Sequence, residues 1–405
     1  MKRILAILLA ALMVLALCAC GAKEKADDKS SADMSDFKIG IITLHDENST
    51  YDKNFLDAVQ RAKANLGLKD DQVIVRTNVD ESADCYEAAV DMADRGCKVV
   101  FADSFGHESY MAQAAAKYPN VQFCHATGTT AHTAKLPNLH NAFASIYEGR
   151  FMAGIAGGMK LNEMIEAGKI TPEQAVIGYV GAYTYAEVIS GYTSFFLGAK
   201  SVCPTATMKV QFTGSWYDET AEKEAATTLI NQGCVLISQH ADSMGAPTAC
   251  EAAGVPDISY NGSTADACPN TFIVSTYIDW TPYFEYIVNC AVKGEAIATD
   301  WVGTIETGSV CMTPVNEKAA APGTADALKA AEADLKAGKI KVFDTARFTV
   351  NGEKLTSYLA DVDTDANYEP DTEVIINGVF EESLKRSAPY FDLRIDDITC
   401  LNEAY

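Results

Sequence analysis

Several short segments combine aromatic rings with carboxylates or hydroxyls directly after apolar, strand-like runs. They are residues 45–51 (HDENSTY), 103–109 (DSFGHES), 213–218 (TGSWYD) and 239–243 (QHADS). A flat ligand can stack on the rings, while the polar side chains hydrogen-bond to its edges. These segments are therefore candidate positions for contacts to a planar, polar small molecule. Trp216, beside the Asp218 carboxylate, is the best single candidate for a stacking platform.

Each of these residues also suits a structural role. Asp46 and Ser109 have the short polar side chains that cap helices. Phe55, which follows the first segment, also begins the apolar face of a predicted helix, and Trp216 also suits a protein core. The sequence leaves these alternatives open.

Catalysis is poorly supported. His240, Asp242 and Ser243 have the side chains of a hydrolytic triad, but residues adjacent in sequence rarely assemble into one. No GxGxxG or Walker segment follows a predicted strand, and no Cys/His cluster has zinc-binding spacing. We therefore expect neither enzymatic activity nor a cofactor or metal ion.

Strands that alternate with helices must position these segments. From Phe37 on, apolar runs such as FKIGIITL alternate with segments such as FLDAVQRAKANLG, whose apolar residues recur every three or four positions. This order is typical of βαβ units and predicts an α/β fold with parallel sheets covered by helices on both faces. The roughly 370 residues involved favour two domains. Beyond about residue 340 the alternation stops, and Asn351-Gly352 predicts a hairpin turn.

The N-terminus has the layout of an export signal. Two basic residues precede an uncharged apolar run at residues 4–17, which is shorter than the roughly 20 residues of a membrane-spanning helix. The run ends in LCACG, which resembles a bacterial lipobox with Cys20 as the lipidated residue. Residues 1–19 are therefore predicted to be a lipoprotein signal peptide, with an ordinary secretory signal as the alternative. The polar residues 20–36 are predicted to be a flexible tether.

The net charge suits an exported protein that its lipid holds at the extracytoplasmic face of the cell membrane. The formal net charge is −23, which disfavours nucleic acid and anionic lipid surfaces as partners. Ten of the 12 cysteines lie beyond the lipobox, several in apolar strand-like runs. We expect most of these to be buried thiols, although one or two disulfides remain possible.

Five segments, taken in order, resemble the BMP (basic membrane protein) family of PnrA-like lipoproteins, the substrate-binding proteins of ABC importers. They are DENSTYDKNFL (46–56), FADSFGHESYMAQAAAKYPNVQF (101–123), EGRFMAGIAGG (148–158), GYVGAYTYAEVISGYTSFFLGAKSV (178–202) and FTGSWYDETAEKEAATTLINQG (212–233). Each motif is weak alone, but five in the correct order are specific. The resemblance covers about residues 37–315.

The resemblance implies two Rossmann-like lobes with a ligand cleft, the type I periplasmic-binding-protein architecture. The N-terminal lobe would comprise residues 37–145 plus about 279–305, and the C-terminal lobe residues 146–278 plus about 306–405. In open α/β sheets, ligands bind beyond the carboxyl ends of the strands. Closure of the lobes around the ligand is the expected working motion.

The resemblance also aligns Asp46 with a ligand-contacting Asp of the family, and Phe55 with its stacking aromatic. Phe105 and Trp216 match further aromatic positions, and Ser109 stands where the family often has an Asp. The predicted ligand-binding residues are Asp46, Tyr51, Phe55, Phe105, Ser109, Trp216, Asp242, Ser243, Asn261 and Trp280.

Two departures from the family pattern bear on the ligand. The family's acidic pair is replaced by Tyr260-Asn261-Gly262-Ser263, and a Lys near the second crossover is replaced by Ile278-Asp279-Trp280. The missing groups are those expected to hold the ribose of a nucleoside. The family pattern therefore implies a purine-type ligand, either a nucleoside or a free base, with another flat heteroaromatic such as riboflavin as the alternative.

The expected function is that of a monomeric binding protein that delivers its ligand to an ABC permease and ATPase. A ligand-sensing surface lipoprotein without a transport role is a second possibility. A nucleoside hydrolase on the same fold is disfavoured, because the sequence has no metal-type Asp cluster and no nucleophile motif.

Overall fold

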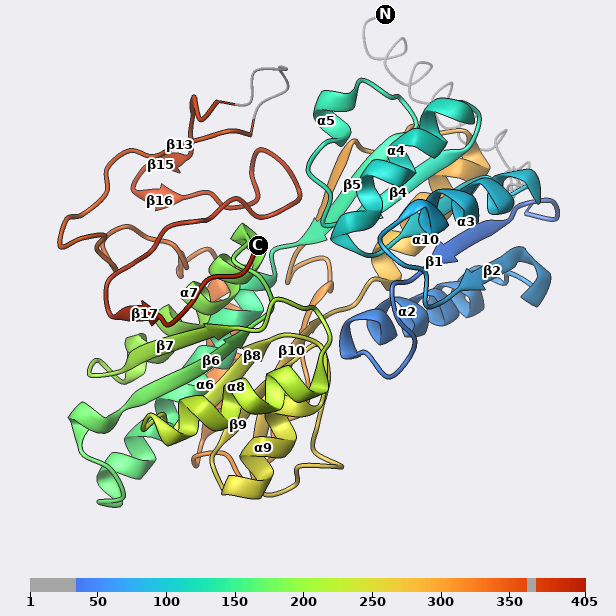
Figure 1. Cartoon of the computed structure of the whole chain (residues 1–405). Helices are drawn as coiled ribbons and strands as arrows, with labels where there is room; N and C mark the ends of the chain where they lie inside the picture. The colour runs from blue at the N-terminus through green and yellow to red at the C-terminus, as the bar shows by residue number, and fades with distance from the viewer. Residues whose placement is uncertain (1–33, 363–368) are drawn as a thin grey trace, which may run out of the picture. The chain divides into compact units, whose positions relative to one another are not determined.

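The structure is a computed structural model that describes residues 34–362 and 369–405. The predicted signal peptide, Cys20 and most of the predicted tether lie outside these residues. Phe37 to Tyr405 form one unit, which contains all the elements described below (Figure 1).

The first lobe is built on a six-stranded sheet in the order β11-β5-β4-β3-β1-β2, in which every pair of neighbours is parallel. Helices α2 and α10 contact each other, as do α3 and α4. The strands are β1 (Ile39–Ile42), β2 (Val73–Arg76), β3 (Val99–Ala102), β4 (Gln122–Ala126), β5 (Leu139–Ala144) and β11 (Asp300–Gly303). The helices are α2 (Thr50–Leu66), α3 (Ala83–Asp94), α4 (Glu108–Lys117), α5 (Ala131–Ala134) and α10 (Thr281–Lys293).

The second lobe is built on a seven-stranded sheet in the order β12-β10-β9-β8-β6-β7-β17, parallel except for the pair β10 and β12. Its strands are β6 (Val176–Gly181), β7 (Thr207–Phe212), β8 (Leu236–His240), β9 (Asp257–Tyr260), β10 (Phe272–Ile278), β12 (Val310–Met312) and β17 (Ile398–Cys400). Its helices are α6 (Ile146–Glu166), α7 (Ala186–Val202), α8 (Glu219–Asn231), α9 (Gly245–Ala253) and α11 (Thr324–Lys336). The predicted α/β fold with parallel sheets is therefore confirmed.

Alternate residues of each buried strand face opposite helix layers. Val100 of β3 packs in a cluster with Met92 of α3 and Met111 of α4. Its neighbour Phe101 packs against Trp280 and Phe284 beside α10 instead. Continuous apolar runs such as VVFA therefore form strands that are buried on both faces.

The glycines of EGRFMAGIAGG allow α6 and α7 to approach closely. A Cβ on Gly154 would lie 1.9 Å from the carbonyl oxygen of Phe195, and one on Gly198 would lie 2.0 Å from that of Phe151. Because real Cβ atoms do not come this close to backbone atoms, each position accepts only glycine without a shift of the helices. This contact anchors α7, whose N-terminal end faces the site described below.

The residues after α11 form a tail of short strands, coloured orange to red in Figure 1. They are β13 (Leu359–Ala360), β14 (Thr372–Glu373), β15 (Ile375–Ile376) and β16 (Val379–Phe380), before β17 joins the second sheet beside β7. The predicted turn at Asn351-Gly352 is confirmed, because Val350 and Glu353 exchange backbone hydrogen bonds of 2.9 and 3.1 Å around it.

The ten cysteines of the described residues are free thiols, and eight of them are buried. Burial raises the pKa of Cys85 and Cys124 to about 12. The prediction that most are buried thiols is confirmed. Within the described residues, none of the helices has the length and apolar character needed to cross a membrane.

Candidate functional site

A pocket lies between the two lobes, where the parallel strands of both sheets end. It contains about 390 Å³ of space that protein atoms do not fill, part of it open to solvent. The first lobe contributes Leu44, His45, Tyr51, Asp52, Ser104, Phe105 and Thr127, and the second lobe contributes Glu187, Trp216, His240, Asp242 and Tyr260.

Most of these residues follow a strand end in the sequence. His45 comes after β1, Phe105 after β3 and Thr127 after β4, while Trp216 comes after β7 and Asp242 after β8. In parallel sheets these ends share one edge, which is the usual ligand site of an open α/β sheet. The two sheets therefore bring together residues that lie far apart in the chain.

Four aromatic rings, here called the aromatic wall, form a chain of contacts beside the pocket, and two of them line it. Tyr183 and Tyr185 are stacked with ring centroids 5.1 Å apart, and Trp216 contacts Tyr183 edge-on at 5.1 Å. Phe105 of the first lobe lies 5.2 Å from Tyr185 of the second. The wall thus joins the lobes and presents Phe105 and Trp216 to the pocket.

The C-terminal residues form hydrogen bonds with the two second-lobe loops that carry Tyr185 and Trp216. The side-chain amide of Asn402 forms two hydrogen bonds with the backbone of Phe212. Its Oδ1 accepts from the Phe212 N–H (2.8 Å), and its Nδ2 donates to the Phe212 carbonyl (2.9 Å). The backbone of Ala404 accepts from the Thr184 N–H (2.7 Å) and donates to the Thr184 hydroxyl (2.9 Å). The loops before Tyr185 and Trp216 are therefore held by the end of the chain.

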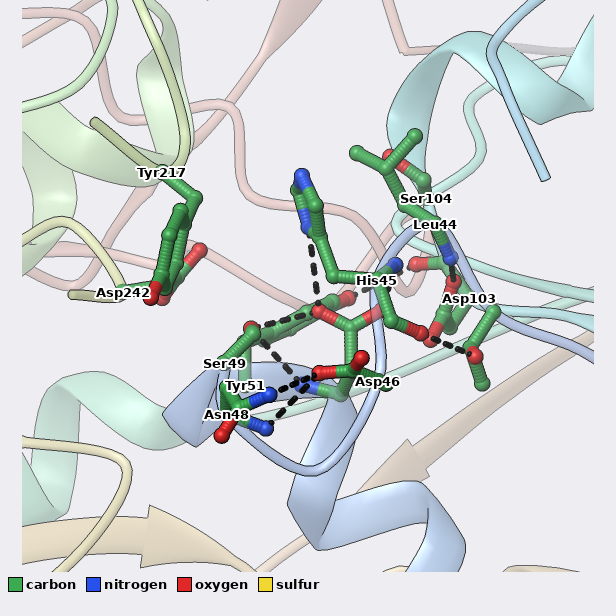
Figure 2. A network of polar contacts seen from close by, with 12 residues as sticks. Leu44, His45, Asp46, Asn48, Ser49, Tyr51, Asp103, Ser104, Tyr217 and Asp242 are labelled. Carbon is green, nitrogen blue, oxygen red and sulfur yellow. Dashed lines mark hydrogen bonds and ion pairs between the residues drawn. The ribbon is translucent and has the colours of Figure 1, made fainter. Parts of the chain in front are cut away.

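Asp52 organises the polar network on the first-lobe side, in which its partners His45 and Ser49 are labelled in Figure 2. Its carboxylate accepts from the His45 N–H (2.7 Å) and from the Ser49 hydroxyl (2.5 Å). Burial works to raise the pKa of Asp52, but the hydrogen bonds from His45 and Ser49 outweigh it and lower the pKa. Asp52 therefore carries a negative charge in the pocket at neutral pH.

Asp103 lies beside this network (Figure 2) and is fully buried. Its Oδ1 accepts from the Leu44 N–H (3.1 Å), and its carbonyl accepts from the Tyr51 hydroxyl (2.8 Å). Burial, reinforced by the charge of Asp52, raises the pKa of Asp103 well above its ordinary value. The backbone carbonyl of Asp103 therefore fixes the position of the Tyr51 hydroxyl. The carboxyl group of Asp103 binds a proton more readily than that of an exposed Asp.

Asp242 is the central carboxyl group on the second-lobe side. Its Oδ1 accepts from the side-chain amide of Asn261 (3.0 Å), and its backbone N–H donates to the carbonyl of Trp216 (2.9 Å). Burial raises the pKa of Asp242 well above its ordinary value, and the charges of Asp52, Glu222 and Glu187 add to this effect. The Asp242 carbonyl also accepts from the Thr50 N–H (3.1 Å), which links the two lobes.

His240 and Glu187 complete the polar lining. The His240 Nε2 lies 3.4 Å from Glu187 Oε1, and the His240 ring packs against Tyr260 with centroids 4.5 Å apart. Burial lowers the pKa of His240, so the ring is neutral near pH 7. Among the described residues that line the pocket there is no Lys or Arg. The pocket therefore suits a ligand that donates hydrogen bonds and carries no negative charge.

Five buried acids should make the free protein less stable as the pH rises from 6.5 to 8. Burial raises the pKa of Asp103 and Asp242, and it raises those of Glu222, Asp257 and Glu382 to about 7. Because the folded state holds these protons more tightly than the unfolded state, stability falls with increasing pH in this window. Burial lowers the pKa of His107, His125, His140 and His240, which acts in the opposite direction, but most of that effect lies below about pH 7 because the pKa of an unfolded histidine is about 6.5. Urea unfolding should show a loss of about 2 kcal/mol or more.

Asp257→Asn is the matched variant for this experiment, since Asp257 is fully buried at the start of β9 and outside the pocket lining. Its curve of unfolding free energy against pH should be flatter than that of the wild type. A wild-type curve that rises between pH 6.5 and 8 would contradict the assignment of protonated buried acids.

Four of the ten residues predicted from sequence line the pocket, namely Tyr51, Phe105, Trp216 and Asp242. Asn261 lies directly behind them, with its side chain 3 % exposed and bonded to Asp242. Ser243 is also buried, and its hydroxyl accepts from the Gly245 N–H at the start of α9.

The other four lie elsewhere. Phe55 and Trp280 are stacked on each other in the first-lobe core, with centroids 4.5 Å apart and exposures of 0 and 1 %. Asp46 forms a local turn in which its carboxylate accepts from the backbone and side chain of Asn48 (Figure 2). Ser109 is exposed on the first turn of α4, where its carbonyl accepts from Gln113.

The sequence prediction did not include several residues that line the pocket. Asp52 and Glu187 lie in the first turns of α2 and α7, each shortly after a strand. Thr127 directly follows β4, and Tyr260 ends β9. Their positions near strand ends are the sequence signal that indicates all four.

Two parallel-sheet lobes that meet at a polar pocket define the class, which is a two-lobed solute-binding protein of the type I periplasmic architecture. The family model of ABC transporter substrate-binding proteins, PnrA-like, matches residues 42–337. The chain belongs to this family, and it is therefore an extracytoplasmic substrate-binding protein of an ABC transporter.

Individual relatives differ in what their names say they bind. A purine-binding protein of Brucella abortus (strain 2308) is 32 % identical over 283 residues, which are 68 % of this chain and 76 % of that protein. A putative ABC transporter glucose-binding protein of Haloferax volcanii, TsgA13, is 34 % identical over 210 residues, 52 % of this chain and 50 % of that protein. A solved solute-binding protein of Conexibacter woesei DSM 14684 shares the fold at a TM-score of 0.60, with 20 % identity over 75 % of this chain and 97 % of that chain.

Proposed function

We propose that this protein binds a purine-type ligand between its lobes and delivers it to an ABC importer. The observation that carries the proposal is that Phe105 and Trp216, one from each lobe, line the same pocket as the carboxyl groups of Asp242 and Glu187. Aromatic faces stack on a flat heterocycle, and carboxylates accept hydrogen bonds from its ring and exocyclic N–H groups. The purine-binding relative from Brucella supports the same ligand class.

A sugar is the second candidate, because the relative from Haloferax is named as a putative glucose-binding protein. Carboxylates and aromatic rings also suit sugar hydroxyls and sugar faces. Riboflavin stays in the comparison as another flat heteroaromatic.

Isothermal titration calorimetry on protein freed of co-purified ligand tests the proposal. The panel contains adenine, hypoxanthine, adenosine, inosine, glucose and riboflavin, with adenosine monophosphate as the charged control. We expect one purine to bind per protein, and we expect the phosphate to abolish binding, because no cation faces the pocket within the described residues. Binding of glucose or riboflavin without any purine would refute the purine assignment.

The same panel separates a nucleoside from a free base. Asn261 and Ile278, which stand where the family has acidic and basic groups, are buried at 3 and 2 % exposure. We propose a free base as the preferred form, because the groups expected to hold the ribose are absent. Tight nucleoside binding without base binding would contradict this preference.

We also propose that the protein is anchored through a lipid on Cys20, which lies outside the described residues. The support is the lipobox sequence LCACG and the polar stretch that follows it. Mass spectrometry of the N-terminal peptide from membranes should show an acylated Cys20, and Cys20→Ala protein should be unmodified. An unmodified wild-type N-terminus that starts at another residue would exclude the anchor.

A further inference from the structure

Thr127 has an unusual backbone conformation for its residue type. Its φ of +65° lies in the left-handed region, which side chains branched at Cβ strongly disfavour. The other non-glycine residues with positive φ in the described chain are Asn, Asp or Lys. Strained residues of this kind persist only where the surroundings impose them, and they concentrate at ligand sites.

Neighbouring groups hold Thr127 in this conformation. Its N–H donates to the carbonyl of Ala142 in β5 (3.1 Å). Three residues further on, the Thr130 N–H donates to the buried carboxylate of Glu108 (2.7 Å), which also accepts from the side chain of Asn141 (3.2 Å). The loop after β4 is therefore fixed from both sides, and Thr127 is one of the residues that line the pocket.

The hydroxyl of Thr127 is buried without a hydrogen-bond partner among the described residues, and the residue is only 4 % exposed. The first lobe supplies two other hydroxyls to the pocket lining, and both are already used. Tyr51 donates to the carbonyl of Asp103 (2.8 Å), and Ser104 donates to Glu81 (2.5 Å). Thr127 therefore carries the one first-lobe hydroxyl in the lining that is still able to donate.

We propose that Thr127 is a ligand-binding residue whose hydroxyl donates a hydrogen bond to an acceptor atom of the ligand, such as a ring nitrogen or a carbonyl oxygen. This inference rests on the proposed function, and it defines the ligand further. The carboxylates recognise the N–H groups of the heterocycle, while Thr127 recognises an unprotonated ring or carbonyl acceptor. The pocket thereby offers partners both for the N–H donors and for the ring-nitrogen or carbonyl acceptors whose positions distinguish one purine from another.

Three substitutions separate this role from a structural one. Thr127→Val has nearly the same shape and lacks the hydroxyl, Thr127→Ser keeps the hydroxyl, and Thr127→Gly removes the side chain and suits the positive φ. Affinity for the tightest-binding purine of the panel should fall about 5- to 10-fold in the Val and Gly variants and stay near wild type in Ser. The melting temperature of the free protein should be unchanged in Val and raised in Gly. Binding and stability thus move in opposite directions in the Gly variant.

The outcomes are distinguishable. Wild-type purine binding with equal affinity in Thr127→Val would overturn the role of Thr127 and leave the proposed function intact. A lower melting temperature in Thr127→Val, with affinity retained, would show that the hydroxyl is structural. If none of the four purines binds the wild type, the proposed function fails, and the inference that rests on it fails as well.

Discussion

Trp216→Ala should weaken ligand binding by about 10- to 100-fold, because stacking of a base on an aromatic side chain contributes about 1–3 kcal/mol. Trp216 is partly exposed and lies on a loop, so its removal takes little apolar surface out of the core. The Trp216 carbonyl, which accepts from Asp242, remains in every variant. Calorimetry should therefore show a large loss of affinity with a nearly unchanged melting temperature.

Trp301→Ala is the matched control, because Trp301 is also partly exposed but packs on Tyr283 in the first lobe, with centroids 4.9 Å apart. This variant should lose stability and keep its affinity. Trp216→Phe, which retains an aromatic face, should recover most of the binding. An unchanged affinity in Trp216→Ala would exclude Trp216 as the stacking platform.

Asp242→Asn should weaken binding by about 10- to 100-fold, as expected for the loss of a charged hydrogen-bond acceptor. The same change should stabilise the free protein at pH 8, where the buried acid must otherwise ionise. In the wild type, binding through the ionised carboxylate should release a proton, so affinity should increase as the pH rises toward the pKa of Asp242. This pH dependence should disappear in the variant.

Calorimetry in buffers of different ionisation enthalpy measures the released proton directly. Asp257→Asn provides the control, since it removes another buried acid of raised pKa from the same sheet without changing the pocket lining. It should gain stability at high pH and bind the ligand as the wild type does. Equal affinities in the two variants would show that the ligand does not contact Asp242.

The sequence predicted the two-lobed α/β fold well, because periodicity and burial are local properties. Few arrangements other than a helix-covered parallel sheet bury both faces of continuous apolar strands together with the apolar face of each helix. The same arrangement provides hydrogen-bond partners for the backbone groups. The family motifs added the order of the lobes. The tail could not be predicted, since its contacts with Phe212 and Thr184 span about 190 to 220 residues and follow no periodic pattern.

The candidate site was predictable only in part. An aromatic residue near a strand end can turn toward the cleft or into the core, and the sequence does not fix this direction. Trp216 borders the pocket, whereas Phe55 continues the buried face of α2 with Ala58 and Val59 and packs on Trp280. The Phe55 helical spacing favoured this core placement. Thr127 had no sequence signal beyond its position directly after β4, because its positive φ and its unpaired hydroxyl depend on distant residues.

The hydrogen bonds of Asn402 and Ala404 beside the aromatic wall have a consequence for ligand affinity. These bonds join protein to protein, so the loops that carry Tyr185 and Trp216 are ordered independently of any bound molecule. A ligand that arrives loses its own rotational freedom but does not have to order the wall, which lowers the entropic cost of association. The final residues of the chain, some 190 positions away from Trp216 in sequence, thereby contribute to the affinity for a ligand although they are not among the residues that line the pocket.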